Sequence, residues 1–209
     1  MKYWMSILAA LALTAVAPAS LADEAAPDEL IRVLSEQVLE IVRNDTRLQE
    51  GEVDSAIERI EAVVVPHFNF RRMTMLAVGR DWRQASQEQQ RRLMDSFYGM
   101  LVRTYSNALT EYKDHTIDFR PLRMSPDDST VRVQTAVRQP GAQAVSVDYM
   151  LERTEEGWKV FDIVVAGVSL VTNYRSAFAQ EIRNGGIDGL IQALEARGGE
   201  GMRFPGHES

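Results

Sequence analysis

Apolar residues recur at three- and four-residue spacing through the first half of the chain, a period that predicts amphipathic helices. Four helices are expected there, over 27–44, 53–65, 70–78 and 86–112. Pro66 ends the second helix, Asn69 caps the third, and Ser86 and Gln89 form a capping box that opens the fourth. The fourth is the longest, and it would cross the whole domain.

From residue 116 the apolar period changes to two, which predicts strands with one buried face. Strands are expected around 117–119, 131–137, 145–151 and 158–165. Pro140 and Gly141 form a turn that makes the second and third strands a hairpin. Two more helices follow, one capped by Ser169 and closed by Gly185-Gly186, the other over 187–196. This order predicts an α+β fold, a curved four-stranded antiparallel sheet wrapped by N- and C-terminal helices.

The N-terminus has the pattern of a cleavable signal peptide. Lys2 precedes an apolar run over 7–16, and Ser20-Leu21-Ala22 places small residues before a cut. The run is shorter than the roughly 20 residues that span a bilayer. We therefore expect a signal peptide over 1–22, a single exported domain over 23–197 and a disordered tail over 198–209.

The amino-acid composition argues against several classes of function. The 209 residues carry a net charge of −7, which argues against nonspecific binding of nucleic acid. The chain has no cysteine, so disulfides, thiolate metal sites and thiol nucleophiles are excluded. The three histidines, His67, His115 and His207, do not have the spacing of a zinc site. Glycine-rich phosphate loops and a nucleophile elbow are also missing from the sequence.

Asp162 is the one carboxylate with unusual surroundings, because it lies between Phe161 and Ile163 in an apolar strand. A buried charge without a partner is costly, so Asp162 must find a partner or face solvent. As a general base in an apolar cup, with Tyr105 or Tyr149 nearby, it would suit proton abstraction from a small apolar substrate. Residue patterns alone thus give an exported α+β domain with or without an apolar pocket.

Seven sequence blocks in order resemble the MlaC family, the periplasmic phospholipid carriers of the maintenance-of-lipid-asymmetry pathway, also called toluene-tolerance proteins. The blocks are 70–74, 79–85, 101–105, 147–149, 157–162, 167–175 and 185–190. The most specific is Gly167 to Arg175, and the first helix and the tail match poorly. The resemblance implies a cone-like fold similar to nuclear transport factors, with acyl chains in an apolar cavity and the headgroup outside.

Lipid cargo gives this arrangement a physical reason. A phospholipid with two chains hides about 30 methylenes, worth on the order of 24 kcal/mol at roughly 0.8 each. The resemblance further implies bound phospholipid as cargo without another cofactor, no enzymatic activity and no nucleotide binding. It implies as partners an outer-membrane lipoprotein–porin assembly and the hexameric lipid-binding subunit of an inner-membrane ABC transporter. We expect a monomer.

Placed on this sequence, the resemblance assigns a lipid-binding wall and a headgroup rim. The helical wall would comprise Leu76, Trp82, Phe97, Leu101 and Tyr105. The opposite wall would comprise Val147, Tyr149, Phe161, Ile163, Val168 and Val171. Arg80, Arg83 and Arg175 would steady the phosphate. On this assignment, Val171→Glu would abolish lipid binding while the domain still folds.

Two other functions fit the same fold. A small exported isomerase or dehydratase would use Asp162 as its base and would need that side chain in the cavity. An adaptor without a ligand would have its cavity filled by side chains.

Overall fold

The computed structural model describes residues 25–49, 52–106, 114–198 and 204–205, so the expected signal peptide and the end of the predicted fourth helix lie outside the described residues. The helices are α1 (Pro27–Asn44), α2 (Thr46–Gln49), α3 (Asp54–Val64), η1 (Val65–His67), α4 (Phe70–Val78), η2 (Gly79–Gln84), α5 (Gln87–Tyr105) and α6 (Leu170–Gly198). The strands are β1 (Thr116–Phe119), β2 (Thr130–Arg138), β3 (Val145–Thr154), β4 (Gly157–Val165) and β5 (Val168–Ser169).

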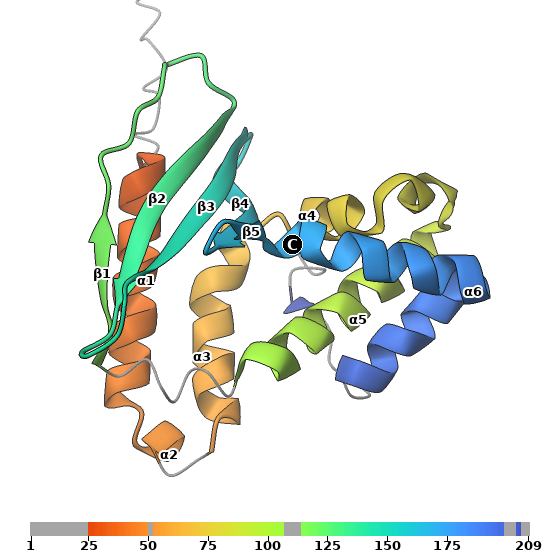
Figure 1. Ribbon diagram of the computed structural model, residues 1–209, viewed down its shortest axis with the longest axis horizontal. Coiled ribbons are helices and arrows are strands. Elements are labelled where there is room, and N and C mark those ends of the chain that lie inside the picture. The colour runs from red at the N-terminus through yellow and green to blue at the C-terminus, as the bar shows by residue number, and fades with distance from the viewer. Residues whose placement is uncertain (1–24, 50–51, 107–113, 199–203, 206–209) are drawn as a thin grey trace, which may run out of the picture.

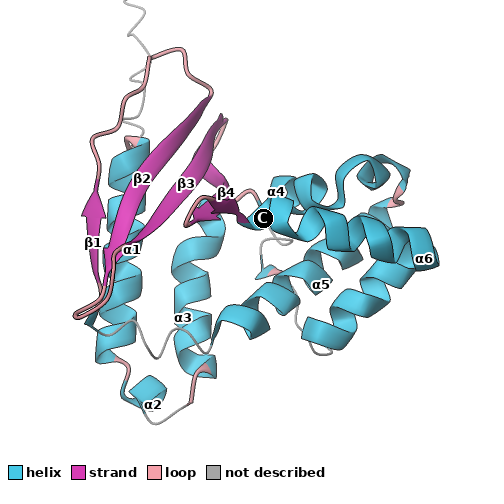
Figure 2. Ribbon diagram, viewed as in Figure 1, coloured by secondary structure: helices cyan, strands magenta, loops and turns pink. Residues whose placement is uncertain are grey.

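The elements gather into two regions that lie side by side (Figure 2). The strands form one antiparallel sheet in the order β1-β2-β3-β4-β5, and α1 and α3 lie along one of its faces (Figure 1). We call this part the sheet region. The elements α4, η2, α5 and α6 pack on one another beside the sheet and form the helical region, whereas α2 packs with α1 and α3.

The local signals in the sequence position most of these elements. Asn69 caps α4 by accepting a hydrogen bond from the Arg72 backbone N–H, and Ser86 and Gln89 form the capping box of α5. Gly141 has a φ of 77° in the turn between β2 and β3. The predicted break at Gly185-Gly186 occurs at Gly186, where φ is 68° and α6 changes direction. These expectations and the α+β class are confirmed.

The sheet has five strands, and the expectation of four is wrong by one short strand. The chain reverses at Ala166 and Gly167, both with positive φ, and Val168–Ser169 then pairs with the end of β4. Two residues are too few to give a period in the sequence. Ser169 also caps α6 as expected, because its Oγ accepts a hydrogen bond from the Thr172 N–H at 3.1 Å.

A short crossing segment joins the two regions. Phe68 pairs with Val160 at the edge of β4, and the Asn69 N–H donates to the Val160 carbonyl at 2.8 Å. Asn69 Nδ2 also donates to Glu152 at 2.8 Å, and Arg72 forms an ion pair with the same carboxylate. These bonds fix the start of the helical region against β3 and β4.

The C-terminal residues pack back onto the helical region at Phe204. Its ring is buried and stacks on Phe70 with 4.9 Å between centroids, and its N–H donates to Asp95 at 2.9 Å. The disordered tail expected over 198–209 stays a prediction, because 199–203 and 206–209 lie outside the described residues.

Candidate functional site

An apolar cavity of about 340 Å³ lies between the sheet and the helices α1 and α3. Residues from α1, α3, β1, β2 and β3 form most of its wall. The lining residues are Ile31, Leu34, Ser35, Val38, Leu39, Val42, Ile60, Val64, Phe68, Tyr105, His115, Ile117, Val137, Val147 and Tyr149. The space exists because aliphatic side chains from two helices and a sheet face it without filling it.

The cavity extends along α1. The α1 residues that line it run from Ile31 to Val42, which at about 1.5 Å per residue spans roughly 16 Å. Half of a bilayer core of about 30 Å is about 15 Å, the length of one acyl chain.

The wall offers little for a charged ligand group. Among the described residues that line the cavity, none is Asp, Glu, Lys or Arg. Its polar members are Ser35, His115, Tyr105 and Tyr149, and the His115 backbone carbonyl already accepts a hydrogen bond from Arg43 at 2.8 Å. A phosphate inside would lose hydration without gaining a cation, so the cavity suits a hydrocarbon chain with its polar end outside.

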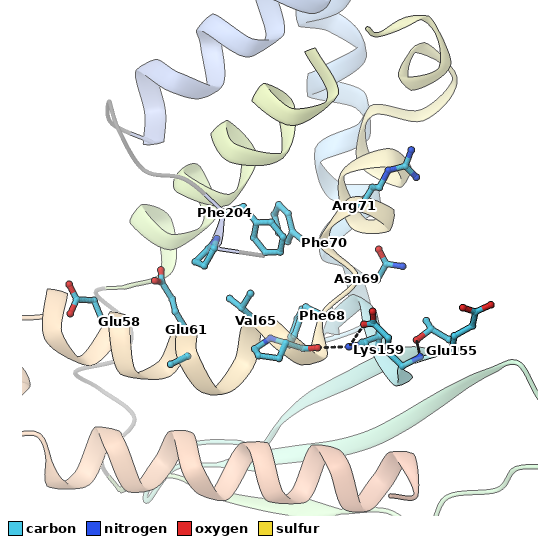
Figure 3. A pocket seen from close by; sticks show the side chains of 15 residues that line it. Glu58, Glu61, Val65, Phe68, Asn69, Phe70, Arg71, Glu155, Lys159 and Phe204 are labelled. Atoms are coloured by element: carbon cyan, nitrogen blue, oxygen red, sulfur yellow. Dashed lines mark hydrogen bonds and ion pairs between the residues drawn. The ribbon is translucent and has the colours of Figure 1, made fainter. Parts of the chain in front are cut away.

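A second, larger cleft of about 1110 Å³ lies at the junction of the two regions (Figure 3). It is open and mixed in character, with carboxylates from α3 and from the β3–β4 turn. Lys159 Nζ at its floor donates to the Pro66 carbonyl at 2.6 Å and pairs with Glu156 at 3.1 Å. Four acidic side chains, Glu58, Glu61, Glu155 and Glu156, border it, which disfavours acyl chains and phosphate alike.

Two groups around this second cleft have shifted pKa values. Burial, together with a hydrogen bond to Glu61, raises the pKa of Tyr98 above its usual value. Burial and the positive charge of Lys159 lower the pKa of His67. Both shifts favour the neutral form, as expected where two packed regions meet.

Three of the predicted lipid-binding residues lie at the apolar cavity. Val147 and Tyr149 face it from β3, and Tyr105 reaches it from the end of α5. The register supports the two β3 positions, because Val147 and Tyr149 are two residues apart and share one face of the sheet.

Five predicted wall residues lie instead in the core of the helical region. They are Leu76, Trp82, Phe97, Leu101 and Val171. Phe97 is fully buried, with its ring centroid 5.7 Å from Phe70 and 5.2 Å from Phe178. The prediction assumed that α5 packs on the sheet, whereas α1 and α3 do so. A helix has the same apolar period whichever partner it faces.

The last three predicted wall residues lie outside the cavity for separate reasons. Phe161 is buried beneath the Arg72 guanidinium, whose carbon is 3.8 Å from the ring centroid. Ile163 packs with the core of the sheet region. Val168 is 57% exposed at the turn into β5. A bulge between Met150 and Leu151 shifts the register of β4, which the alternation in the sequence does not reveal.

The three predicted rim arginines are far from the cavity wall. Arg175 donates from Nε and Nη2 to the Leu76 carbonyl at 3.1 and 2.8 Å and so ties α6 to α4. Arg80 is 87% exposed beside Asp81, and Arg83 is exposed on η2, at the end of the helical region away from the sheet (Figure 1). The path of the loops sets where these three arginines lie, and the sequence carries no signal for that path.

The lining residues that the sequence analysis missed belong to α1 and α3. Leu34, Val38, Leu39, Ile60 and Val64 were recognised only as apolar helix faces. The first helix matches the resembled family poorly, so the resemblance assigned no role to it. The signal that could have found them is the pair of apolar faces itself, preceding a sheet that needs one face covered.

Asp162 finds partners, as the sequence requires. It is buried, and its carboxylate accepts hydrogen bonds from Ser169 Oγ at 2.5 Å and from the Val171 N–H at 3.1 Å. It thereby caps the N-terminus of α6, where a negative charge is favourable. Asp162 is not among the residues that line the cavity, so the geometry gives it a structural role.

Two features of the described residues bear on other kinds of site. Within the described ranges, no group of three or more His, Asp or Glu side chains is placed to hold a metal ion. No helix in the same part of the chain has the length and apolar character needed to cross a membrane.

Comparison with known proteins places this geometry in a family. Residues 32–196 match the MlaC protein family. The toluene tolerance protein ttg2D of Pseudomonas putida is 30% identical over 118 residues, which cover 56% of this chain and 54% of that relative. The intermembrane phospholipid transport system binding protein MlaC of Haemophilus influenzae is 21% identical over 98% of this chain and 97% of its own.

A solved structure is similar over most of the fold. The phospholipid-binding protein of Ralstonia solanacearum, determined in complex with a phospholipid, is 35% identical with a TM-score of 0.77. The match covers 81% of this chain and 94% of that one. The family match spans the α1–β3 cavity and both regions of the molecule, and the chain belongs to the MlaC protein family.

Proposed function

We propose that this protein is a periplasmic phospholipid carrier that moves lipids between the outer and inner membranes. The observation that carries the proposal is the uncharged channel between α1 and the sheet, whose length matches one acyl chain. The phospholipid complex of the Ralstonia relative supports the choice of cargo. The signal-peptide pattern at the N-terminus supports the location.

In this proposal the acyl chains lie against Leu34 and Val38 on one side and Val147 on the other. The headgroup stays in water, so the protein discriminates little between headgroups. The proposed partners are the outer-membrane lipoprotein–porin assembly and the lipid-binding subunit of the inner-membrane ABC transporter.

Native mass spectrometry tests the proposal on protein purified from a bacterial periplasm without detergent. We expect a mass excess equal to a phospholipid, identified after solvent extraction. Val38→Trp fills the cavity and should lower the lipid-bound fraction at least tenfold. Val33→Trp is the matched control, because Val33 lies on the same helix and is 40% exposed on its outer side.

Two outcomes contradict the proposal. One is a wild-type protein at its bare sequence mass that stays bare after incubation with vesicles. The other is a lipid-bound fraction in Val38→Trp equal to that in Val33→Trp. The first would favour a ligand-free adaptor, and the second would place the cargo outside the α1 channel.

A further inference from the structure

Two stretches without a charged residue come together in the fold, although 25% of all residues are charged. One stretch covers residues 139–147 and the other covers residues 163–174. They are separated in sequence by β3 and most of β4. Neither stretch contains Asp, Glu, Lys or Arg.

The fold brings these two stretches together at one end of the sheet. Val147 pairs with Val165, Val165 pairs with Val168, and the Ala166 N–H donates to the Ser146 carbonyl at 2.9 Å. Val145 lies two residues before Val147 on β3. These three valines, Val145, Val165 and Val168, therefore share one face of the sheet, and we call them the valine patch.

The valine patch is exposed and continuous with the cavity. Val145 and Val165 are each 43% exposed and Val168 is 57% exposed, although they lie on the face that α1 and α3 cover elsewhere. Val147, between them in the register, lines the cavity. The apolar wall of the cavity thus runs out onto the surface at this end of the sheet without meeting a charge.

The turn that carries the patch is held in an uncommon conformation. Ala166 has a φ of 50° and Gly167 a φ of 84°. Positive φ is rare for a residue with a Cβ, and such strain clusters at functional sites. The turn places Val165 and Val168 side by side at the sheet edge.

The chemistry of the patch favours a protein over a bilayer as its partner. Binding to an anionic membrane surface draws on Lys and Arg near the contact, and the two stretches have neither. The patch also lacks the Trp and Phe that anchor proteins at a lipid interface. The chain's net charge of −7 repels anionic headgroups. Clustered valines instead match an uncharged apolar face on a folded partner.

We infer that the valine patch docks onto an envelope membrane protein that exposes an uncharged apolar surface around a lipid path. The inference rests on the proposed carrier function, since a carrier must transfer its chains without exposing them to water. Contact at the patch would join the cavity wall directly to the receiving surface. This surface involves β3, β4 and β5 and leaves the second, acidic cleft free.

The test measures binding of dye-labelled protein to three kinds of vesicle. These are envelope vesicles that retain the bacterium's membrane proteins, the same vesicles after protease treatment, and protein-free vesicles of the extracted lipids. We expect wild-type protein to bind untreated envelope vesicles at least tenfold more tightly than the other two. Val145→Glu and Val165→Glu should remove that difference, whereas Val33→Glu, the control on α1, should preserve it.

Circular dichroism and native mass spectrometry separate folding and cargo from docking. If Val145→Glu or Val165→Glu does not fold, Ala144→Glu in the exposed β2–β3 loop provides the same charge beside the patch. Folded patch variants should still carry the wild-type amount of lipid. A wild-type protein without lipid contradicts the carrier function, but the vesicle comparison still decides whether the patch docks.

Three results would overturn the inference. Patch variants could bind envelope vesicles as wild type does. Wild type could bind protein-free vesicles equally well, which would make the patch a bilayer contact. Light scattering could show a dimer that Val145→Glu dissociates, which would make a second copy of the chain the occupant.

Discussion

The helical region and the sheet region are both built from apolar residues at regular spacing, yet only the helical region fills its interior. In the helical region, aromatic rings of Phe70, Phe97 and Phe178 interlock with centroids 5.2–5.7 Å apart. In the sheet region, aliphatic side chains from α1 and α3 face the sheet across about 340 Å³. Large rings close the gaps between helices, whereas Val, Leu and Ile over a curved sheet leave a channel.

The difference shows how one fold divides two tasks. The packed helical region supplies stability, because its buried residues touch neighbours on every side. The sheet region keeps the apolar cavity open, and side chains that filled this cavity would leave no room for an acyl chain. Substitutions of the same chemical kind should therefore have opposite consequences in the two regions.

A buried carboxylate gives the largest contrast. Val171 is 1% exposed in the helical core, so Val171→Glu should cost several kcal/mol and unfold the domain. This differs from the expectation, drawn from the sequence, that the variant would fold without lipid. Val147→Glu should fold, because Val147 is only half-buried at the end of the sheet and its carboxylate can reach water there, and should lose bound lipid.

Circular dichroism and native mass spectrometry on both variants measure this contrast. A folded, lipid-free Val171→Glu beside an unfolded Val147→Glu would reverse the assignment of core and cavity.

Truncation of one large side chain in each region gives a smaller contrast. Phe97→Ala removes a fully buried ring and should lower the free energy of unfolding by about 3–5 kcal/mol. Leu39→Ala enlarges a space that already exists and should cost at most about 2 kcal/mol. Urea titration of both variants measures the difference. Equal losses would mean that the sheet region is packed as tightly as the helical region.

The smallest expected effect is a pH dependence at the junction. Because the pKa of His67 is lowered by burial and by Lys159, the unfolded chain takes up its proton first as the pH falls below about 6.5. The contribution of His67 to stability is complete above that pH and declines below it. Urea midpoints at about pH 7.5 and about pH 5.5 should therefore differ more in wild type than in His67→Gln. Identical pH dependence in the two proteins would mean that His67 stays accessible to protons in the folded state.

Sequence signals predicted where the helices and strands begin and end better than they predicted which of them pack together. The caps at Asn69, Ser86 and Ser169 and the break at Gly186 follow from local chemistry, and all four lie where expected. The cavity did not follow from local chemistry. Its wall depends on which helices cover the sheet, and the period of α5 is the same whether it faces the sheet or α6.

The predicted site residues lie away from the cavity mainly where loops and strand register set their positions. Arg80 and Arg83 lie on η2, which the chain carries away from the sheet, and Arg175 binds a backbone carbonyl of α4. The β4 bulge and the two-residue strand β5 leave Val168 on the surface. Tyr105, Val147 and Tyr149 were placed at the cavity because β3 alternates regularly and α5 ends beside it.

Photocrosslinking with a phospholipid that carries a diazirine on one acyl chain tests the central claim most directly. The loaded protein is irradiated and digested, and the labelled peptides are identified by mass spectrometry. The account predicts labels on α1, within residues 27–44, and on β3 near Val147. Labels confined to α5 and α6 would contradict it, because the acyl chains would then lie in the helical region.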